Sequence, residues 1–531
     1  MGRKPMAARE MEELRMGNPA HWMPENIIGN MSLKDLLVSN DYRHIAIKGI
    51  FTAIILLAVG GFFAMIFRSE LALPDVQFVG AKVYMTLMTM HGMIMVFGFL
   101  IPMVVSICYY MLPRVLGTDR LYWAGAAQLS YWILIAAAVL LVIGRPDFTW
   151  TAYAPMSIRT GNAYIWMGHV AIILVAVSEF FAGAVLVRNA MSGKGGWSDT
   201  PLMAWACGTV GLLFMASTLP LAFVGYGLLA DWAGWGNTAY FDPARGGSVQ
   251  FFLYMFWTYG HPAVYLPFVP AIAIIYTIMP RILGNPMWSY WSGVIAFVLL
   301  ALGAMPIGPH HFQPLYTVSG GYERFVQILT LLVFIPSVLH VFNWTATLFM
   351  NPIPDSARRS IPFKFMVMSI AFIVYGGATA FLNAQIAPDS DFIHNTYWIP
   401  AHFHAMFFGF AGQMAIAGFY YLYPYFTGRM FHQGMANAHF WLWQIGLFIK
   451  ITAMGVAGYL YFPRWVYDYL DLPGWPEAQL FITIGGFLVG LGFLFFAVNL
   501  AWSARYGNAV DDDPWPVTDD EKAAVAAAPA E

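Results

Sequence analysis

The chain has 531 residues, of which 59% are hydrophobic and only 10% are charged, and its formal net charge at pH 7 is -2. Because soluble proteins carry about 25% charged residues, this composition excludes an ordinary soluble domain and predicts a polytopic membrane protein. The near-zero charge indicates no basic surface for nucleic acid. The two cysteines both fall in apolar runs, which excludes a disulfide framework and a cysteine-rich metal site.

Residues 1–43 form a polar N-terminal segment in which no cleaved signal peptide is recognisable. Between residues 44 and 505, apolar stretches long enough to cross about 30 Å of hydrocarbon follow one another. Their approximate windows are 45–67, 83–112, 121–144, 162–187, 203–229, 248–280, 288–308, 323–350, 363–384, 397–426, 437–461 and 477–503. We therefore predict an all-α integral membrane protein with about twelve transmembrane helices, followed by a disordered acidic tail, residues 506–531.

The basic residues between these windows indicate the orientation of the bundle. With the N-terminus inside, the inner segments contain more Lys and Arg than the outer loops, where the basic residues include Lys82, Arg145, Arg159, Arg245, Arg324 and Arg464. The positive-inside rule then predicts that the N-terminal segment and the acidic tail are both cytoplasmic.

Six of the 13 histidines fall at comparable depth, towards the predicted outer half of the bundle: His91, His261, His310, His311, His402 and His404. Imidazole is the usual ligand of haem iron and also suits copper, and no carboxylate or thiolate cluster accompanies these residues. For any single one of them, a buried histidine with a structural hydrogen bond is the alternative. At hydrocarbon depth, however, polar side chains are costly and usually have a function.

Two of these histidines, His402 and His404, stand two positions apart in a helix predicted to begin near Pro400. Residues at this spacing point about 200° away from each other, so one helix can hold two metal groups, one against each face. His261, His310 and His311 supply a three-nitrogen copper site. The other three histidines allow one iron with two histidine ligands and one iron with a single histidine and an open face.

Tyr265 follows His261 by four residues, so the two side chains share a helix face. A phenol beside a copper-ligating imidazole could give a proton and an electron in oxygen chemistry. The alternative is an ordinary aromatic side chain in a helix seam.

These motifs resemble subunit I of the haem–copper oxygen reductases over residues 45–505. The resemblance is carried by H-G-M-I-M at 91–95, W-T-A-Y-A-P at 150–155, G-H-P-A-V-Y at 260–265, P-H-H-F at 309–312 and H-N-T-Y-W-I-P-A-H-F-H at 394–404. More narrowly, the chain is similar to the B-type branch. That branch is indicated by A-I-I-Y-T-I-M-P at 273–280, I-P-S at 335–337, and Ala263, where A-type enzymes carry Glu after His-Pro.

The resemblance implies a twelve-helix catalytic domain at 44–505 with two haems, of types that stay open, and one copper ion. It implies that His91 and His404 ligate a low-spin haem and that His402 ligates a high-spin haem. It further implies that His261, His310 and His311 hold the copper, with Tyr265 covalently joined to His261 and both acting in catalysis. Asp391, His394 and Arg464 match positions near the haem propionates, whereas Trp465 replaces a second family arginine.

By the same resemblance, the chain is the catalytic subunit of a terminal respiratory oxidase in the inner (cytoplasmic) membrane of a prokaryote. It would reduce dioxygen to water with electrons from a cytochrome c or another small donor, coupled to proton uptake and pumping. A subunit II with a dinuclear copper centre is the implied partner. A single proton path through Tyr265, Tyr276, Ser337 and His340 is expected, because the loop P-R-V-L-G-T-D-R lacks the A-type entrance pattern.

Three other readings compete with this one. A nitric oxide reductase of the same superfamily commonly needs a carboxylate beside its histidines, although some B-like reductases contain copper. A transporter has no use for six histidines at these spacings and would show repeat symmetry. A haem-binding structural subunit would lack a copper histidine.

Glu179 and Lys450 also fall at membrane depth, and we expect neither to act directly in catalysis.

Overall fold

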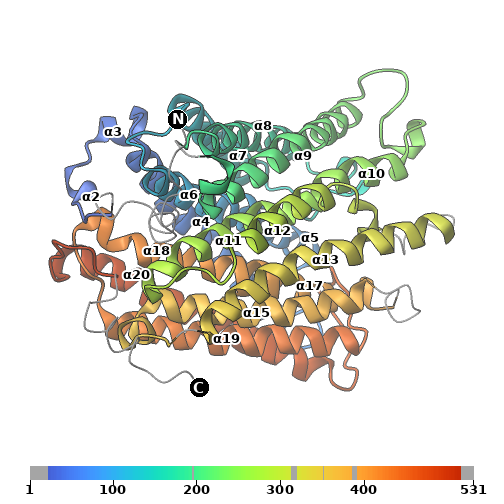
Figure 1. Cartoon of the computed structure of the whole chain (residues 1–531). Coiled ribbons are helices and arrows are strands. Elements are labelled where there is room, and N and C mark those ends of the chain that lie inside the picture. Colours follow the sequence, from blue (N-terminus) through green and yellow to red (C-terminus); the bar gives the residue numbers. More distant parts are fainter. Residues whose placement is uncertain (1–21, 194–195, 313–319, 351, 385–391, 516–531) are drawn as a thin grey trace.

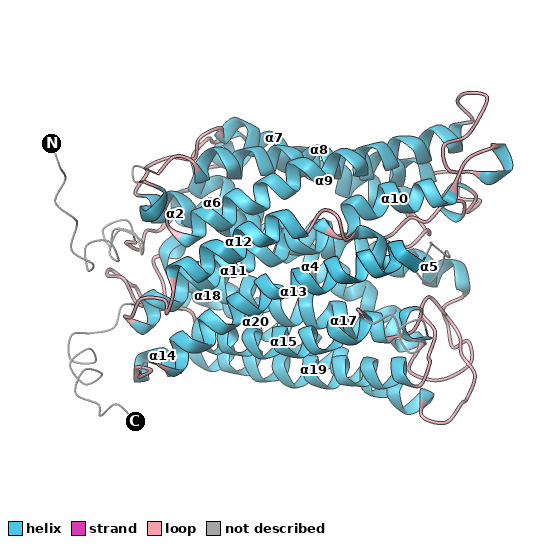
Figure 2. Cartoon of the chain, turned by 45° about the vertical axis from the view of Figure 1, so that its right-hand side comes forward, coloured by secondary structure: helices cyan, strands magenta, loops and turns pink. Residues whose placement is uncertain are grey.

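The computed structural model describes residues 22–193, 196–312, 320–350, 352–384 and 392–515, and all regular structure within these ranges is helical. Two short helices, α2 (Ile27–Asn30) and α3 (Leu33–Val38), precede a bundle of long helices that run side by side (Figures 1 and 2). The predicted all-α architecture is confirmed.

Within the described ranges, 11 helical spans are long and apolar enough to cross a membrane. They are α4 (Tyr42–Glu70), α5 to α6 (Ala81–Leu116), α7 (Ala124–Gly144), α8 (Ile165–Ala190), α9 (Leu202–Ala233), α10 to α11 (Val249–Leu283), α13 (Gly320–Phe349), α15 (Ile361–Asn383), α17 to α18 (Trp398–Thr427), α19 (Gln433–Tyr459) and α20 (Trp475–Tyr506). The apolar helix α12 (Tyr290–Gly303) is shorter and occupies the remaining predicted window, 288–308.

Three of the spans are not regular α-helices throughout. A π-helix, η2 (Ile94–Leu100), joins α5 (Ala81–Met93) to α6 (Ile101–Leu116), and a second one, η8 (Ala405–Gly412), joins α17 (Trp398–His404) to α18 (Gln413–Thr427). The third irregular span breaks between α10 (Val249–Gly260) and α11 (Pro262–Leu283). Pro262 causes this break because it has no N–H to donate to the preceding turn.

The irregular segments coincide with the candidate histidines. η2 begins three residues after His91, η8 begins directly after His404, and His261 occupies the break between α10 and α11. The two π-helices also meet, because the ring centres of Phe99 and Phe408 are 6.1 Å apart. π-Helical segments are rare and often mark functional sites, and both of these segments follow a candidate histidine.

Both described ends of the chain pack against the same end of the bundle. The Glu25 N–H donates to the carbonyl oxygen of Tyr425 over 3.1 Å, and the Val510 N–H donates to that of Gly428 over 3.0 Å. The first part of the acidic tail continues this packing, because the Trp515 indole N–H donates to the Tyr421 carbonyl. The expected disorder of the tail otherwise concerns residues 516–531, which lie outside the described residues.

Candidate metal centre

All six histidines singled out from the sequence line one cavity of about 1880 Å³ between the helices. His91 comes from α5, His261 from the α10–α11 break, His310 and His311 from the 3-10 helix η6 (Gly308–His311), and His402 and His404 from α17. Segments more than 300 residues apart in the chain, α5 and α17, thus face the same space. The cavity walls are mainly apolar, so each imidazole stands out as a possible ligand.

Three of the imidazoles converge on one point. His261 Nδ1 lies 2.9 Å from His310 Nε2 and 2.9 Å from His311 Nε2. One ring nitrogen from each residue lies within 4.8 Å of the other two, close enough for all three to bind a single ion. Three nitrogen donors without a thiolate suit copper among the ions that imidazole binds well.

Neighbouring groups orient these three rings. The Nδ1 atom of His310 lies 3.0 Å from the Thr330 hydroxyl, and the ring of His311 stacks on Trp257 with ring centres 4.0 Å apart. His261 turns its Nδ1 towards the cluster, which leaves its buried Nε2 without a hydrogen-bond partner among the described residues. The ring centre of Tyr265 lies 5.0 Å from that of His261, in agreement with the shared face predicted from their spacing.

The remaining three histidines are held in one common way. His91 Nδ1 lies 2.9 Å from the Gly60 carbonyl, His402 Nδ1 lies 3.1 Å from that of Gly376, and His404 Nδ1 lies 2.7 Å from that of Pro400. Because a carbonyl oxygen only accepts, each Nδ1 carries the proton. Nε2 is therefore the nitrogen with a free lone pair in each ring, as in metal-binding histidines whose tautomer is held by a backbone carbonyl.

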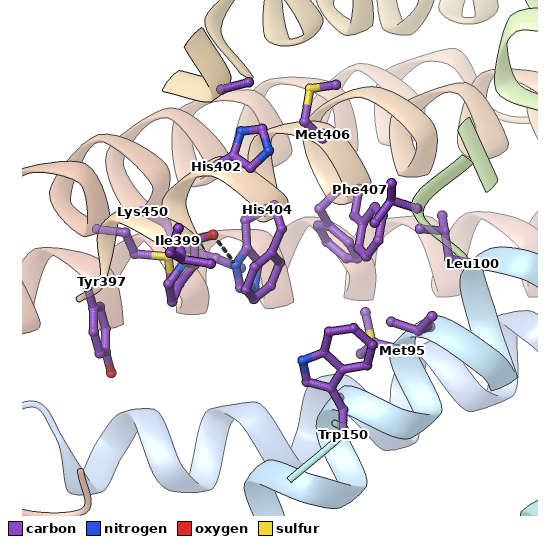
Figure 3. A pocket seen from close by; sticks show the side chains of 18 of the residues that line it. Met95, Leu100, Trp150, Tyr397, Ile399, His402, His404, Met406, Phe407 and Lys450 are labelled. Atoms are coloured by element: carbon purple, nitrogen blue, oxygen red, sulfur yellow. Dashed lines mark hydrogen bonds between the residues drawn. The ribbon is translucent and has the colours of Figure 1, made fainter. Parts of the chain in front are cut away.

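The rings of His402 and His404 point away from each other across α17, as the sequence spacing predicts (Figure 3). The Nδ1 atom of His402 has a second partner on α15, the Thr379 hydroxyl at 3.1 Å. One short helix thus presents a possible iron ligand on each of two sides.

Three cations line the same cavity: Arg68, Lys450 and Arg464. Arg68 donates only to neutral groups, among them the Gln479 side chain at 2.7 Å and the Tyr397 hydroxyl at 3.3 Å. The guanidinium carbon of Arg464 lies 4.7 Å from the centre of the Trp465 ring. Within the described part of the chain, none of the three forms an ion pair with a carboxylate. An anionic group in the cavity would therefore find positive partners that no described carboxylate neutralises.

Sequence reasoning missed Arg68, because an arginine directly after the end of a predicted span is usually attributed to snorkelling. It did single out His394, whose Nε2 donates to the His311 carbonyl over 2.9 Å. Burial and the nearby Arg464 guanidinium lower the pKa of His394 to about 4, so this imidazole is neutral at pH 7. Asp391, expected in the same region, lies outside the described residues.

The residues expected in a proton path fall into two groups. Tyr265 and Ser337 line the large cavity. Further along α11, the Tyr276 hydroxyl lies 2.9 Å from His340 Nδ1 and accepts a hydrogen bond from Asn343 over 3.2 Å. Tyr276 also borders a second cavity of about 240 Å³. Asn343 was missed, because an amide on a helix carries no motif.

Glu179 is buried and lines neither of these two cavities. One of its carboxylate oxygens accepts a hydrogen bond from the Tyr259 hydroxyl over 2.9 Å, and the other has no partner among the described residues.

Comparison with known proteins identifies the family to which this chain belongs. The family model described as "Cytochrome C and Quinol oxidase polypeptide I" matches residues 44–488, which is most of the chain. The chain belongs to this family. The family predicted from the histidine motifs is thereby confirmed, and this oxidase subunit I is an oxidoreductase of the haem–copper class.

Relatives of this subunit I match it along most of its length. It is 30% identical over 488 residues to cytochrome c oxidase subunit 1 of Thermostichus vulcanus, covering 90% of this chain and 86% of the relative. It is 28% identical over 494 residues to cytochrome c oxidase subunit 1 of Bacillus subtilis, covering 91% of this chain and 78% of the relative. A solved heme-copper terminal oxidase dimer has the same fold, with a TM-score of 0.75 at 20% identity over 91% of this chain and 87% of its own.

In this subunit I, the close approach of η6 to α10 depends on Gly308. A Cβ atom at this position would lie 2.4 Å from the Trp257 carbonyl oxygen, so Gly308→Ala must displace the turn that carries His310 and His311. We expect the variant to lose copper affinity by about 10–100-fold, as when groups that orient metal ligands are changed. Copper content after dialysis against a graded chelator measures this loss. Gly125→Ala is the matched control, because a Cβ there meets nothing within 4 Å, and equal copper retention in the two variants would contradict the prediction.

Proposed function

We propose that this chain is the catalytic subunit of a terminal respiratory oxidase that reduces dioxygen to water. The observation that carries the proposal is the three-histidine cluster with Tyr265 beside it, in the same cavity as His402. A cytochrome c-type donor would supply the electrons, and a subunit II with a dinuclear copper centre would deliver them. The proposed location is the inner membrane of a prokaryote, with both ends of the chain in the cytoplasm.

The donor set fits two haems and one copper ion. His91 and His404 would hold a low-spin haem iron, because the carbonyl that fixes the tautomer of each ring leaves its Nε2 free to bind. His402 would hold the high-spin haem iron on the other side of α17, and His261, His310 and His311 would hold the copper. When bound, these groups supply the electron-transfer and oxygen-binding chemistry. Arg464, His394, Arg68 and Asp391 are the proposed surroundings of the haem carboxylates.

Tyr265 would bring a proton to the reacting centre. Its ring lies against His261, whose Nε2 has no hydrogen-bond partner among the described residues, so this nitrogen is free for the covalent link to the phenol ring that we propose. Forming this N–C bond removes one hydrogen from Nε2 and one from a ring carbon, a two-electron oxidation for which dioxygen, the proposed substrate, is the oxidant. The imidazole can form that link without giving up its contact to the cluster, because Nδ1 points to His310 and His311.

Protons would reach the cavity by a single path through Tyr276, His340, Ser337 and Tyr265. The hydrogen bond between Tyr276 and His340 supports its inner part, and the position of Ser337 on the cavity wall supports its outer part. Ala263 offers no carboxylate for a second path. This path and the motifs at 273–280 and 335–337 are the grounds on which we assign the chain to the B-type branch.

His340→Phe tests the path. Phenylalanine cannot hydrogen-bond to the Tyr276 hydroxyl, so we expect oxygen reduction to slow by about 10²-fold, the lower bound for losing a positioned proton-transfer group. Flash-induced proton uptake by the reduced enzyme measures the step directly. The matched control is His439→Phe, because His439 is equally buried and lies 3.0 Å from the Tyr420 hydroxyl, away from the cavity. Equal slowing in both variants would refute a special role for His340.

Oxygen rather than nitric oxide is the proposed substrate. The described residues place only histidines in the three-nitrogen cluster, and Glu179 is engaged by Tyr259 instead. The deciding experiment combines elemental analysis for copper and iron with oxygen and nitric oxide consumption by one purified sample. Copper beside two haem irons, with faster oxygen uptake, supports the oxidase. A third iron in place of copper, or nitric oxide consumption alone, identifies a reductase.

A further inference from the structure

Lys450 is a cation in the wall of the cavity that no proposed step uses. It lies within α19, nine residues before the end of that helix at Tyr459. Its ammonium nitrogen is 5.5 Å from the ring centre of Phe408, and the side chain lines the cavity together with His91 and His404. Figure 3 shows Lys450 next to His404, on the side of Tyr397.

The packing of α19 on α20 holds this lysine in place. Helix α20 approaches the Lys450 backbone closely at Gly485, where a Cβ atom would lie 2.6 Å from the Lys450 nitrogen and 2.7 Å from the Gly446 carbonyl oxygen. A side chain at position 485 would separate the two helices. The glycine contact therefore fixes the helix face from which Lys450 reaches the cavity.

Lys450 has no compensating negative charge in the described part of the chain. No carboxylate there forms an ion pair with it, and Arg68, which lines the same cavity and acts on Lys450 electrostatically, is another cation. An uncompensated cation at membrane depth is costly, and such residues generally mark functional sites. The group that Lys450 acts on must therefore be sought in the cavity.

We propose that the ammonium group of Lys450 raises the reduction potential of the haem held by His91 and His404. The inference rests on the proposed assignment of these two histidines to the low-spin haem. Ferric iron carries one more positive charge than ferrous iron, so a nearby ammonium group destabilises the oxidised form. In a medium with an effective dielectric constant of about 20, two unit charges about 10 Å apart interact strongly enough to change such an equilibrium on the order of tenfold.

The test is a redox titration of the purified holoenzyme, followed by the absorption of the low-spin haem. Lys450→Met and Lys450→Gln should shift its potential downwards by about 59 mV, which is tenfold for a one-electron couple. Lys450→Arg keeps the charge and should stay close to the wild type. Lys364→Met is the control for removing a lysine elsewhere, because the Lys364 ammonium group donates to Asn437 over 2.7 Å and does not line the cavity.

Each outcome is decisive for the proposal. An unchanged potential in both neutral variants overturns it, and so does an equal fall in Lys450→Arg, which would show that a specific contact rather than charge is lost. If one neutral variant fails to assemble, the other still gives the measurement. A wild-type enzyme without a low-spin haem spectrum would instead refute the assignment of His91 and His404, which separates the two failures.

Discussion

Replacing His310 by alanine is expected to remove copper from the enzyme while both haem spectra remain. The imidazole supplies one of three converging nitrogens, and among the described residues its Nδ1 is held by the Thr330 hydroxyl alone. Oxygen reduction should fall to about one-thousandth or less, because metal ions contribute several kcal/mol to such transition states and each ~1.4 kcal/mol is tenfold in rate. Elemental analysis and oxygen uptake on the same preparation measure both effects.

The control for this variant is His432→Ala. The Nδ1 atom of His432 accepts a hydrogen bond from the Met435 N–H at the start of α19, and the residue does not line the cavity. Its loss should cost about 1 kcal/mol of stability, as for other helix caps, with copper and turnover retained. Full copper content in His310→Ala would mean that the three-histidine cluster does not hold the ion.

Alanine substitutions at His402 and His404 are expected to remove different haems. His404→Ala should abolish the low-spin haem spectrum and leave the high-spin haem, and His402→Ala should have the reverse effect. The reason is geometric, since the two rings leave α17 on opposite sides and are fixed by different carbonyls, those of Gly376 and Pro400. Turnover should fall to background in both variants, because each lacks one group needed to pass electrons to oxygen.

The measurement is the absorption of each haem in purified, dithionite-reduced variants, with carbon monoxide added to mark the haem that has an open position. His402→Ala should lose the carbon monoxide-induced change and His404→Ala should keep it. If one substitution removed both haems, α17 would be needed for assembly as a whole, and His91→Ala would then decide whether the low-spin haem alone can be lost.

Much of the fold could be predicted from the sequence, because a membrane span is a local property. Eighteen or more apolar residues need no distant partner to be recognised, and each predicted window coincides with a helical span, α12 included. The irregularities inside the spans were not predicted. The π-helices after His91 and His404 leave no signal in hydropathy, since they change hydrogen bonding without changing composition.

The candidate site likewise has features that the sequence predicts and features that depend on contacts between distant helices. The opposite faces of His402 and His404 and the shared face of His261 and Tyr265 follow from helix periodicity alone. The roles of Arg68 and Asn343 could not be foreseen, because their partners, Gln479 and Tyr276, lie on other helices far away in the chain.

By itself, therefore, the sequence determined the membrane bundle, the family, the ligand candidates and the way one helix divides two of them between its faces. Only the tertiary structure decided that six histidines from four separate segments surround one cavity. It also decided which nitrogen of each ring is free to bind, and that three cations face the cavity without a described carboxylate partner. Helix periodicity depends only on residues that are close in the chain. The convergence of the histidines and the charge balance of the cavity depend instead on packing between helices, which the order of residues does not specify.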